Sequence, residues 1–331
     1  MQNLFSWLLN IMLFSSFFTC LLLCSIFIYL SRYFKFLDLP DDRKAHKKPT
    51  PKIGGLSIAL TYFFFNNNNL LTIPLLILFL LITLDDFYNL NRFLRLFVQV
   101  LIPIPLLLSM QTQNISLLIL LIIGLILFVA FINLFNFFDG LNTLLISQFI
   151  LILGYYYITF QSNNLIQFKT EIISLLGSSL GFLLFNIFGL SFLGDIGSCL
   201  IGFYLAFLVI SGSLINEFDF KKIILIVAPL IPILTDTCLI IIIRFLNGEK
   251  FFSTPHRQHA YQIISRFGFK HWEVSILYIL KTLIYIGIIF LLNLYRSSTA
   301  YYLSAVSFFI FVDIISILLI RKKASRKNIL I

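Results

Sequence analysis

The chain has 331 residues, of which 60% are hydrophobic and only 11% are charged, and its mean hydropathy is +0.99. Soluble globular domains carry about 25% charged residues, so this composition excludes a soluble protein and indicates a polytopic membrane protein. The apolar runs are continuous rather than alternating, which excludes a membrane β-barrel. The formal net charge of +10 does not indicate a nucleic-acid partner, because the basic residues gather in short segments between apolar runs.

The apolar runs predict an all-α integral membrane protein with about 10–11 transmembrane helices and polar loops at one membrane face. Residues 1–31 contain no Lys or Arg, so we expect the first run to be a retained helix rather than a cleaved signal peptide. No hydrophilic stretch is long enough for a soluble domain, and residues 1–331 are therefore expected to form one transmembrane domain with a basic tail at 321–331. In chain order, the expected helices lie at 4–30, 54–65, 70–84, 94–110, 116–134, 143–160, 171–189, 198–215, 223–245, 274–292 and 300–320.

The distribution of basic residues predicts the orientation of these helices. Nineteen of the 24 Lys and Arg residues lie on one side of the eleven-helix arrangement, in segments 31–53, 85–95, 244–270 and 321–331. The side of a membrane protein that is rich in Lys and Arg faces the cytoplasm. The sequence therefore predicts an amino terminus outside and a carboxyl terminus inside, with the positive charge attracting acidic lipids or phosphates.

Two acidic residues, Asp85 and Asp86, directly follow the expected helix at 70–84. Adjacent carboxylates repel each other and are unfavourable near a bilayer, so we expect a compensating charge. A divalent cation bound through oxygen atoms would provide it. A solvated helix end is the alternative for this pair considered alone.

The stretch "NLFNFFDGLN" places Asn133, Asn136, Asp139 and Asn142 at spacings that bring side chains to neighbouring positions of a helix. These amide and acid groups suit either a polar binding site or the capping of a helix end. The later stretch "FNIFGLSFLGDIGS" places Asp195 among glycines, which would let backbone amides approach a ligand. Asn186 ends the preceding expected helix and could face the same pocket, whereas a capped turn is the alternative.

The stretch "STPHRQHAYQ" contains His256, Arg257 and His259. Two imidazoles and a guanidinium are suited to binding a diphosphate. A zinc site is less favoured because a closed site needs more ligands, and a solvated basic loop is the remaining alternative. Residues 260–267 are expected to form a short interfacial helix. With the basic loop at 37–55, these polar groups all fall on the same expected membrane face.

In sequence order, "DLPDDRKAHKKPTPKIGGLSI", "LDDFYNLN", "NLFNFFDGLN", "FLGDIGS" and "HRQHAYQ" resemble the motifs of the polyprenyl-phosphate N-acetylhexosamine-1-phosphate transferases, the glycosyltransferase family 4 type. The resemblance covers about residues 30–275. It implies Mg2+-dependent transfer, with Mn2+ as an alternative ion, of a sugar 1-phosphate from a UDP-N-acetylhexosamine to undecaprenyl phosphate. UMP is the other product. The implied location is the cytoplasmic face of the bacterial inner membrane, with a homodimer as one assembly state.

The resemblance also implies roles for individual residues. Asp85 and Asp86 match an acidic pair assigned to metal binding or to activation of the lipid phosphate, and Asp195 matches a metal ligand. Asn136 and Asp139 match residues of the nucleotide pocket. His256, Arg257 and His259 occupy the histidine motif, and Asn186 and Lys48 are expected to help bind substrate. The roles of Arg43, Lys44 and His46 in the RKxH element do not follow from the sequence.

Two departures narrow the expected substrate. "HRQHAYQ" lacks the consecutive histidines of the peptidoglycan branch and is more similar to the O-antigen-initiating branch, which handles 6-deoxy amino sugars. Asn142 stands where some relatives have an aspartate. We therefore expect a 6-deoxy N-acetylhexosamine, with N-acetylglucosamine as the alternative. A cation-coupled transporter is a rival from another class, but its acids would lie nearer the midplane than these helix-end acids. A non-catalytic scaffold is a further rival, which the intact charged motifs disfavour.

Overall fold

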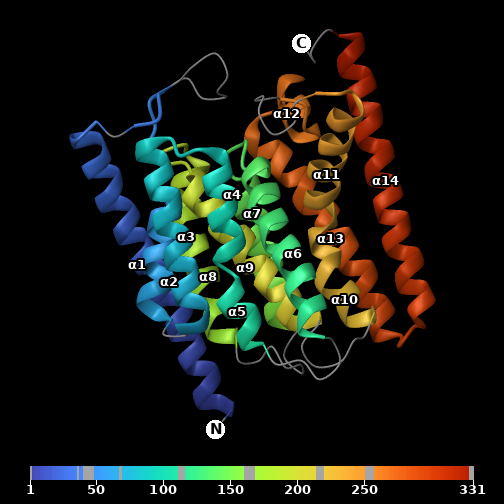
Figure 1. Ribbon diagram of the computed structural model, residues 1–331, viewed down its shortest axis with the longest axis horizontal. Helices are drawn as coiled ribbons and strands as arrows, with labels where there is room; N and C mark the ends of the chain where they lie inside the picture. Colours follow the sequence, from blue (N-terminus) through green and yellow to red (C-terminus); the bar gives the residue numbers. More distant parts are fainter. Residues whose placement is uncertain are drawn as a thin grey trace. The chain divides into compact units, whose positions relative to one another are not determined.

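A computed structural model describes residues 2–35, 37–39, 48–66, 69–110, 116–159, 168–213, 220–249 and 257–327. The described residues lie mostly in helices, as the sequence predicts (Figure 1). The chain divides into two compact units, Met1–Phe218 (unit 1) and Asp219–Ile331 (unit 2), and each is described here by itself.

Unit 1 contains nine helices, counted over its described residues. They are α1 (Gln2–Tyr33), α2 (Gly54–Phe65), α3 (Asn69–Tyr88), α4 (Arg92–Leu101), α5 (Ile104–Ser109), α6 (Leu117–Phe138), α7 (Leu144–Thr159), α8 (Lys169–Ile187) and α9 (Gly194–Ser213). Helix α9 is the central element of the unit, because α2, α3 and α6 all pack against it. Its own side chains are accordingly among the most buried of the apolar helices.

Small residues set how closely the helices of unit 1 approach one another. On α8, Gly177 and Gly181 lie against the backbone of α1, and a β-carbon at Gly181 would come within 2.7 Å of the Phe17 carbonyl oxygen. Gly55 of α2 lies against the backbone of Gly197 in α9. The contact between Gly55 and Gly197 brings the start of α2 close to the start of α9.

Unit 2 contains α10 (Phe220–Val227), a 3-10 turn η3 (Ala228–Leu230), α11 (Ile231–Leu246), α12 (Ala260–Arg266), α13 (His271–Leu294) and α14 (Thr299–Arg326). Pro229 and Pro232 lie in and just after the turn that separates α10 from α11. Proline lacks the backbone N–H that a continuous helix needs, so the direction of the chain can change there.

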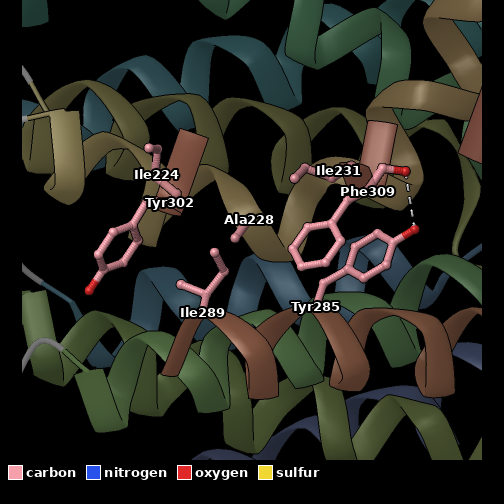
Figure 2. Close-up of a cluster of buried hydrophobic side chains, with 7 residues drawn as sticks. All are labelled: Ile224, Ala228, Ile231, Tyr285, Ile289, Tyr302 and Phe309. Atoms are coloured by element: carbon pink, nitrogen blue, oxygen red, sulfur yellow. Dashed lines mark hydrogen bonds between the residues drawn. The ribbon is translucent and has the colours of Figure 1, made fainter. Parts of the chain in front are cut away.

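A hydrophobic cluster joins the helices of unit 2. Figure 2 shows Tyr285 and Phe309 with their rings side by side, and their stacked rings have centroids 4.0 Å apart. The Tyr285 hydroxyl also lies 3.4 Å from the carbonyl oxygen of Phe309. The complete cluster consists of Ile224, Ala228, Ile231, Tyr285, Ile289, Tyr302 and Phe309.

The structure confirms the expected all-α membrane class. In the described part of the chain, nine helical stretches are long and apolar enough to cross a membrane, with α4–α5 and α10–α11 each counted as one stretch. The two remaining expected helices correspond to α2 and α7, which are apolar but shorter. The short helix expected at 260–267 is also present, as α12.

Candidate active site

Two loops of unit 1 pair with each other and form the base of the candidate site. The carbonyl of Pro51 accepts a hydrogen bond from Phe192 N at 2.9 Å, and the amides of Gly54 and Gly55 donate to the carbonyls of Phe192 and Leu193. The pairing needs glycine at position 55, because a β-carbon there would collide with the backbone of Gly197. It aligns the start of α2 with the start of α9.

Asn186 connects this base to the loop that follows α6. Its side-chain oxygen accepts a hydrogen bond from Thr143 N at 2.6 Å, and its amide nitrogen donates to Ser191 O at 2.9 Å. The Asn186 side chain is buried. Its observed role is therefore to hold loops in place, and the substrate contact expected from the sequence stays a prediction.

Asn136 and Asp139 lie at the end of α6 beside α9. The Asn136 amide donates to the Ser198 hydroxyl at 3.1 Å, which joins the two helices. Asp139 follows the last residue of α6 and is half-buried. Burial and the nearby charge of Asp195 raise the pKa of the Asp139 carboxyl well above its usual range, whereas the Lys52 charge opposes this rise. The surroundings of Asp139 thus disfavour an uncompensated negative charge.

Asp85 and Asp86 have different surroundings although they are neighbours in α3. The Asp85 carboxylate forms an ion pair with Arg95 at 2.6 Å and accepts a hydrogen bond from Leu90 N at 2.9 Å. These contacts hold the turn between α3 and α4. Asp86 is exposed, and its charge acts on Lys52. The charges of Asp86 and Asp195 therefore both act on Lys52, whereas the Asp85 carboxylate is bound within its own turn.

Lys52 is the cation of this acidic group, which we define as Asp38, Asp86, Asp139 and Asp195. Its ammonium lies 3.3 Å from the Asp38 carboxylate, and the side chain is 41% exposed. Burial alone would lower the pKa of the Lys52 ammonium, but the charges of Asp38, Asp195 and Asp86 outweigh burial and raise it. Asp195 is exposed in the first turn of α9, next to Gly194.

The acidic group has the chemistry that Mg2+ requires. Mg2+ prefers oxygen ligands and usually binds one or two carboxylates together with water and substrate phosphates. Asp86 and Asp195 offer two exposed carboxylates, and Asp139 offers a third, less exposed one. Within the described ranges, no three acidic, His or Cys side chains form a ready-made metal cluster. The donor set therefore fits an ion whose remaining ligands come from water and substrate.

The histidine motif belongs to unit 2, and its first histidine, His256, lies outside the described residues. The His259 ring is buried, stacks on Tyr261, and has its Nδ1 atom 3.6 Å from the Asp236 carboxylate. Asp236 also accepts hydrogen bonds from Ala260 N at 3.0 Å and from the Tyr278 hydroxyl at 2.6 Å. Asp236 thus holds the start of α12, and a substrate contact of His259 stays a prediction.

The other residues expected at the site have less definite positions. Arg257 is half-buried, and its charge acts on Arg266 of α12. Lys48 is exposed, and its carbonyl accepts a hydrogen bond from the Thr50 hydroxyl at 3.0 Å. Asn133 donates to Gln99 at 2.9 Å and thereby joins α6 to α4. Binding by Arg257 and Lys48 stays a prediction, and the RKxH element at 43–46 lies outside the described residues.

Sequence reasoning missed Lys52, Asp38 and Asp236. The sequence places Lys52 among the basic residues of a loop, and its position shortly before the double glycine at the start of a helix is a signal that could identify it. Asp236 lies within an expected membrane helix, where an ionisable residue is rarely without a function. The pairing of Asp38 with Lys52 depends on the loop conformation, and the sequence contains no sign of it.

Comparisons with known proteins find sequence relatives of one kind. Residues 68–213 match glycosyl transferase family 4, a range that includes Asp86, Asp139 and Asp195. A probable undecaprenyl-phosphate N-acetylglucosaminyl 1-phosphate transferase of Bacillus subtilis (strain 168) is 26% identical over 311 residues, covering 86% of this chain and 82% of that protein. An undecaprenyl-phosphate alpha-N-acetylglucosaminyl 1-phosphate transferase of Thermotoga maritima is 32% identical over 187 residues, covering 56% of this chain and 60% of that protein.

Proposed function

The chain belongs to the polyprenyl-phosphate N-acetylhexosamine-1-phosphate transferases, and from this premise we propose that it transfers an N-acetylhexosamine 1-phosphate from a UDP-sugar to undecaprenyl phosphate. The observation that carries the proposal is the acidic group with Lys52 at one end of unit 1. Carboxylates there suit a metal ion, and an ammonium suits a phosphate. The same residues in a soluble protein could not reach a lipid-embedded acceptor.

The proposed chemistry is phosphoryl transfer. A phosphate oxygen of the lipid attacks the phosphorus nearer the sugar, the bond from that phosphorus to the bridging oxygen breaks, and UMP leaves with the electron pair. Such reactions depend mainly on positioning and on charge stabilisation. We propose that Asp86 and Asp195, with Asp139, would hold Mg2+, which when bound supplies positive charge to the substrate phosphates. The paired loops at 51–55 and 191–195 position these side chains.

Two candidate sugars have support. N-acetylglucosamine is favoured by the names of both relatives. A 6-deoxy N-acetylhexosamine is favoured by the segment "HRQHAYQ", which resembles the branch that starts O-antigen synthesis. In either case the product would be the first lipid-linked sugar of a surface polysaccharide. We place the reaction at the cytoplasmic face of the bacterial inner membrane, because most basic residues lie in segments expected on that side.

The test is a membrane assay with undecaprenyl phosphate and a panel of UDP-N-acetylhexosamines. Lipid-linked product is followed by mass and UMP by chromatography, with and without Mg2+. We expect one sugar to give product and UMP in equal amounts, and Asp195→Asn to abolish both. Product from no member of the panel would contradict the proposed function. Full activity of the Asp195→Asn variant would contradict only the metal assignment.

A further inference from the structure

Lys52 has a position that packing does not explain. Its backbone lies between two residues that belong to the loop pairing, Pro51 and Gly54, and a β-carbon added at Gly194 would lie only 3.3 Å from the Lys52 carbonyl oxygen. The Lys52 side chain, in contrast, is 41% exposed. Because its backbone is held by the loop pairing and its side chain is partly exposed, Lys52 can contact a ligand that enters from solvent.

The charges around Lys52 indicate the chemical class of this ligand. The carboxylates of Asp38, Asp86 and Asp195 all act on its ammonium, and the Lys52 charge acts in turn on Asp139. These four carboxylates outnumber the one ammonium that lies among them. The phosphates of both substrates of the proposed reaction are anions and would be repelled by these carboxylates. A positive charge placed among the acids, at the point where phosphates must come close, reduces that repulsion.

The chemistry of lysine fits this position. An ammonium is a compact point charge with three donors, and it binds phosphate oxygens without demanding a planar arrangement. Lys52 forms an ion pair with Asp38 at 3.3 Å, which is longer than a typical charge-assisted hydrogen bond of about 2.7–2.9 Å. The ammonium can therefore exchange a loose partner for a substrate oxygen without losing a short bond.

We propose that Lys52 is a catalytic residue whose ammonium binds a phosphate oxygen of a substrate during the transfer. This inference rests on the proposed function and adds a residue outside the matched range 68–213. The phosphate belongs either to the diphosphate of the UDP-sugar or to the monophosphate of the lipid. Lys52 takes no part in the covalent step. It stabilises negative charge while the acceptor oxygen bonds to phosphorus and the bond to the UMP oxygen breaks.

The experiment compares Lys52→Gln, Lys52→Arg and a matched control, Lys169→Gln. Lys169 is the first residue of α8, at the opposite end of that helix from Asn186, and it lies over the Tyr157 ring. Purified full-length variants are assayed for kcat and for the KM of each substrate. Titration calorimetry measures UDP-sugar binding independently, and Tm in detergent reports folding.

We expect Lys52→Gln to lower kcat/KM by about 100-fold or more, the usual loss when one charge-stabilising donor is removed. Lys52→Arg should recover a large part of the activity, and Lys169→Gln should behave as the wild type. A higher KM and weaker calorimetric binding for the UDP-sugar would assign the donor diphosphate to Lys52. A higher KM for undecaprenyl phosphate alone would show that the Lys52 ammonium binds the acceptor phosphate. A fall confined to kcat would show that the ammonium acts only in the transition state.

Two results would overturn the proposal. One is a Lys52→Gln variant with kcat and both KM values within about twofold of the wild type. The other is a loss of activity in Lys52→Gln that the fraction of unfolded protein fully accounts for, because a residue that only neutralises its neighbours would act through stability and not through substrate contact. Both results presuppose an active wild-type enzyme. An inactive wild type would instead contradict the proposed function.

Discussion

At the scale of single residues, identical side chains have different chemistry because their neighbours differ. Asp85 and Asp86 are adjacent in α3, yet Arg95 and the Leu90 amide bind the first carboxylate and leave the second exposed. An ion pair and a backbone donor thus bind the Asp85 carboxylate within its own turn. The Asp86 carboxylate is exposed, and its charge acts on the Lys52 ammonium.

This difference predicts unequal effects of two matched substitutions. We expect Asp86→Asn to lower kcat by about 100-fold or more, because it removes a charge from the proposed metal ligands. Asp85→Asn should retain most of the activity, since asparagine can still accept the Leu90 hydrogen bond, and its main effect should be a lower Tm. Mg2+-dependent UMP release and thermal unfolding in detergent measure both. Equal losses of activity in the two variants would show that Asp85 also reaches the substrates.

At the scale of the elements, glycines decide which helices can meet. Gly55 of α2 lies against Gly197 of α9, and this contact allows the loop pairing that aligns Lys52 with Asp195. A larger residue at position 55 would collide with backbone atoms of α9, and no rearrangement of a side chain could relieve that collision. The site therefore depends on a contact in which no catalytic group takes part.

Gly55→Ala tests this dependence. The added methyl group would overlap the Gly197 backbone, and overpacking of this kind destabilises proteins by about 1–3 kcal/mol or more. We expect a lower Tm together with lost activity. Gly154→Ala in α7 is the control, because nothing lies within 4 Å of a β-carbon there, and alanine in a helix is favourable by about 0.5–1 kcal/mol. A Gly55→Ala protein with wild-type Tm and activity would contradict the assigned role of the contact.

A buried polar group joins three helices of unit 2. The Asp313 carboxylate of α14 is fully buried and lies 2.8 Å from the Lys281 ammonium of α13. It also accepts hydrogen bonds from the Tyr285 hydroxyl and, at 2.8 Å, from the Thr235 hydroxyl of α11. Removing one member of a buried ion pair typically destabilises a protein by about 3–5 kcal/mol, because the other charge is left without compensation.

The pair therefore predicts a non-additive result. We expect Lys281→Met and Asp313→Asn each to lower Tm strongly, whereas the double variant should lose less than the sum of the two, since no isolated charge remains. Thermal unfolding of the four proteins in one detergent gives the comparison. Strictly additive losses would mean that the two side chains contribute independently, despite their short separation.

At the scale of the whole molecule, the sequence predicted the helices well and the site in part. Apolar runs located the membrane helices because hydrophobicity over a long window does not depend on tertiary contacts. The sequence also singled out Asp86, Asp139 and Asp195 as candidate site residues, because acidic side chains are conspicuous beside apolar helices, and their roles stay a prediction. It could not separate Asp85 from Asp86 or recognise Lys52, because ion pairs at 2.6 Å and 3.3 Å follow from loop conformation.

The orientation of the chain in the membrane is a prediction that remains open to direct measurement. We expect single cysteines at position 48 and position 322 to react with a membrane-impermeant maleimide only after the cytoplasmic side is exposed. A cysteine at position 297, in the turn between α13 and α14, should react in intact cells. The reason is that basic segments remain on the cytoplasmic side during insertion. Labelling of position 48 in intact cells would reverse the proposed orientation.

Two consecutive residues of α11 form hydrogen bonds to different helices of unit 2, and these bonds limit rotation of α11. Thr235 binds Asp313 on α14, whereas the next residue, Asp236, binds the first amide of α12 and the Tyr278 hydroxyl on α13. Turning α11 about its own axis would break both sets of bonds together. Any displacement of α12 would therefore act on α11 and α13 through Asp236, and α11 is tied in turn to α14 through Thr235.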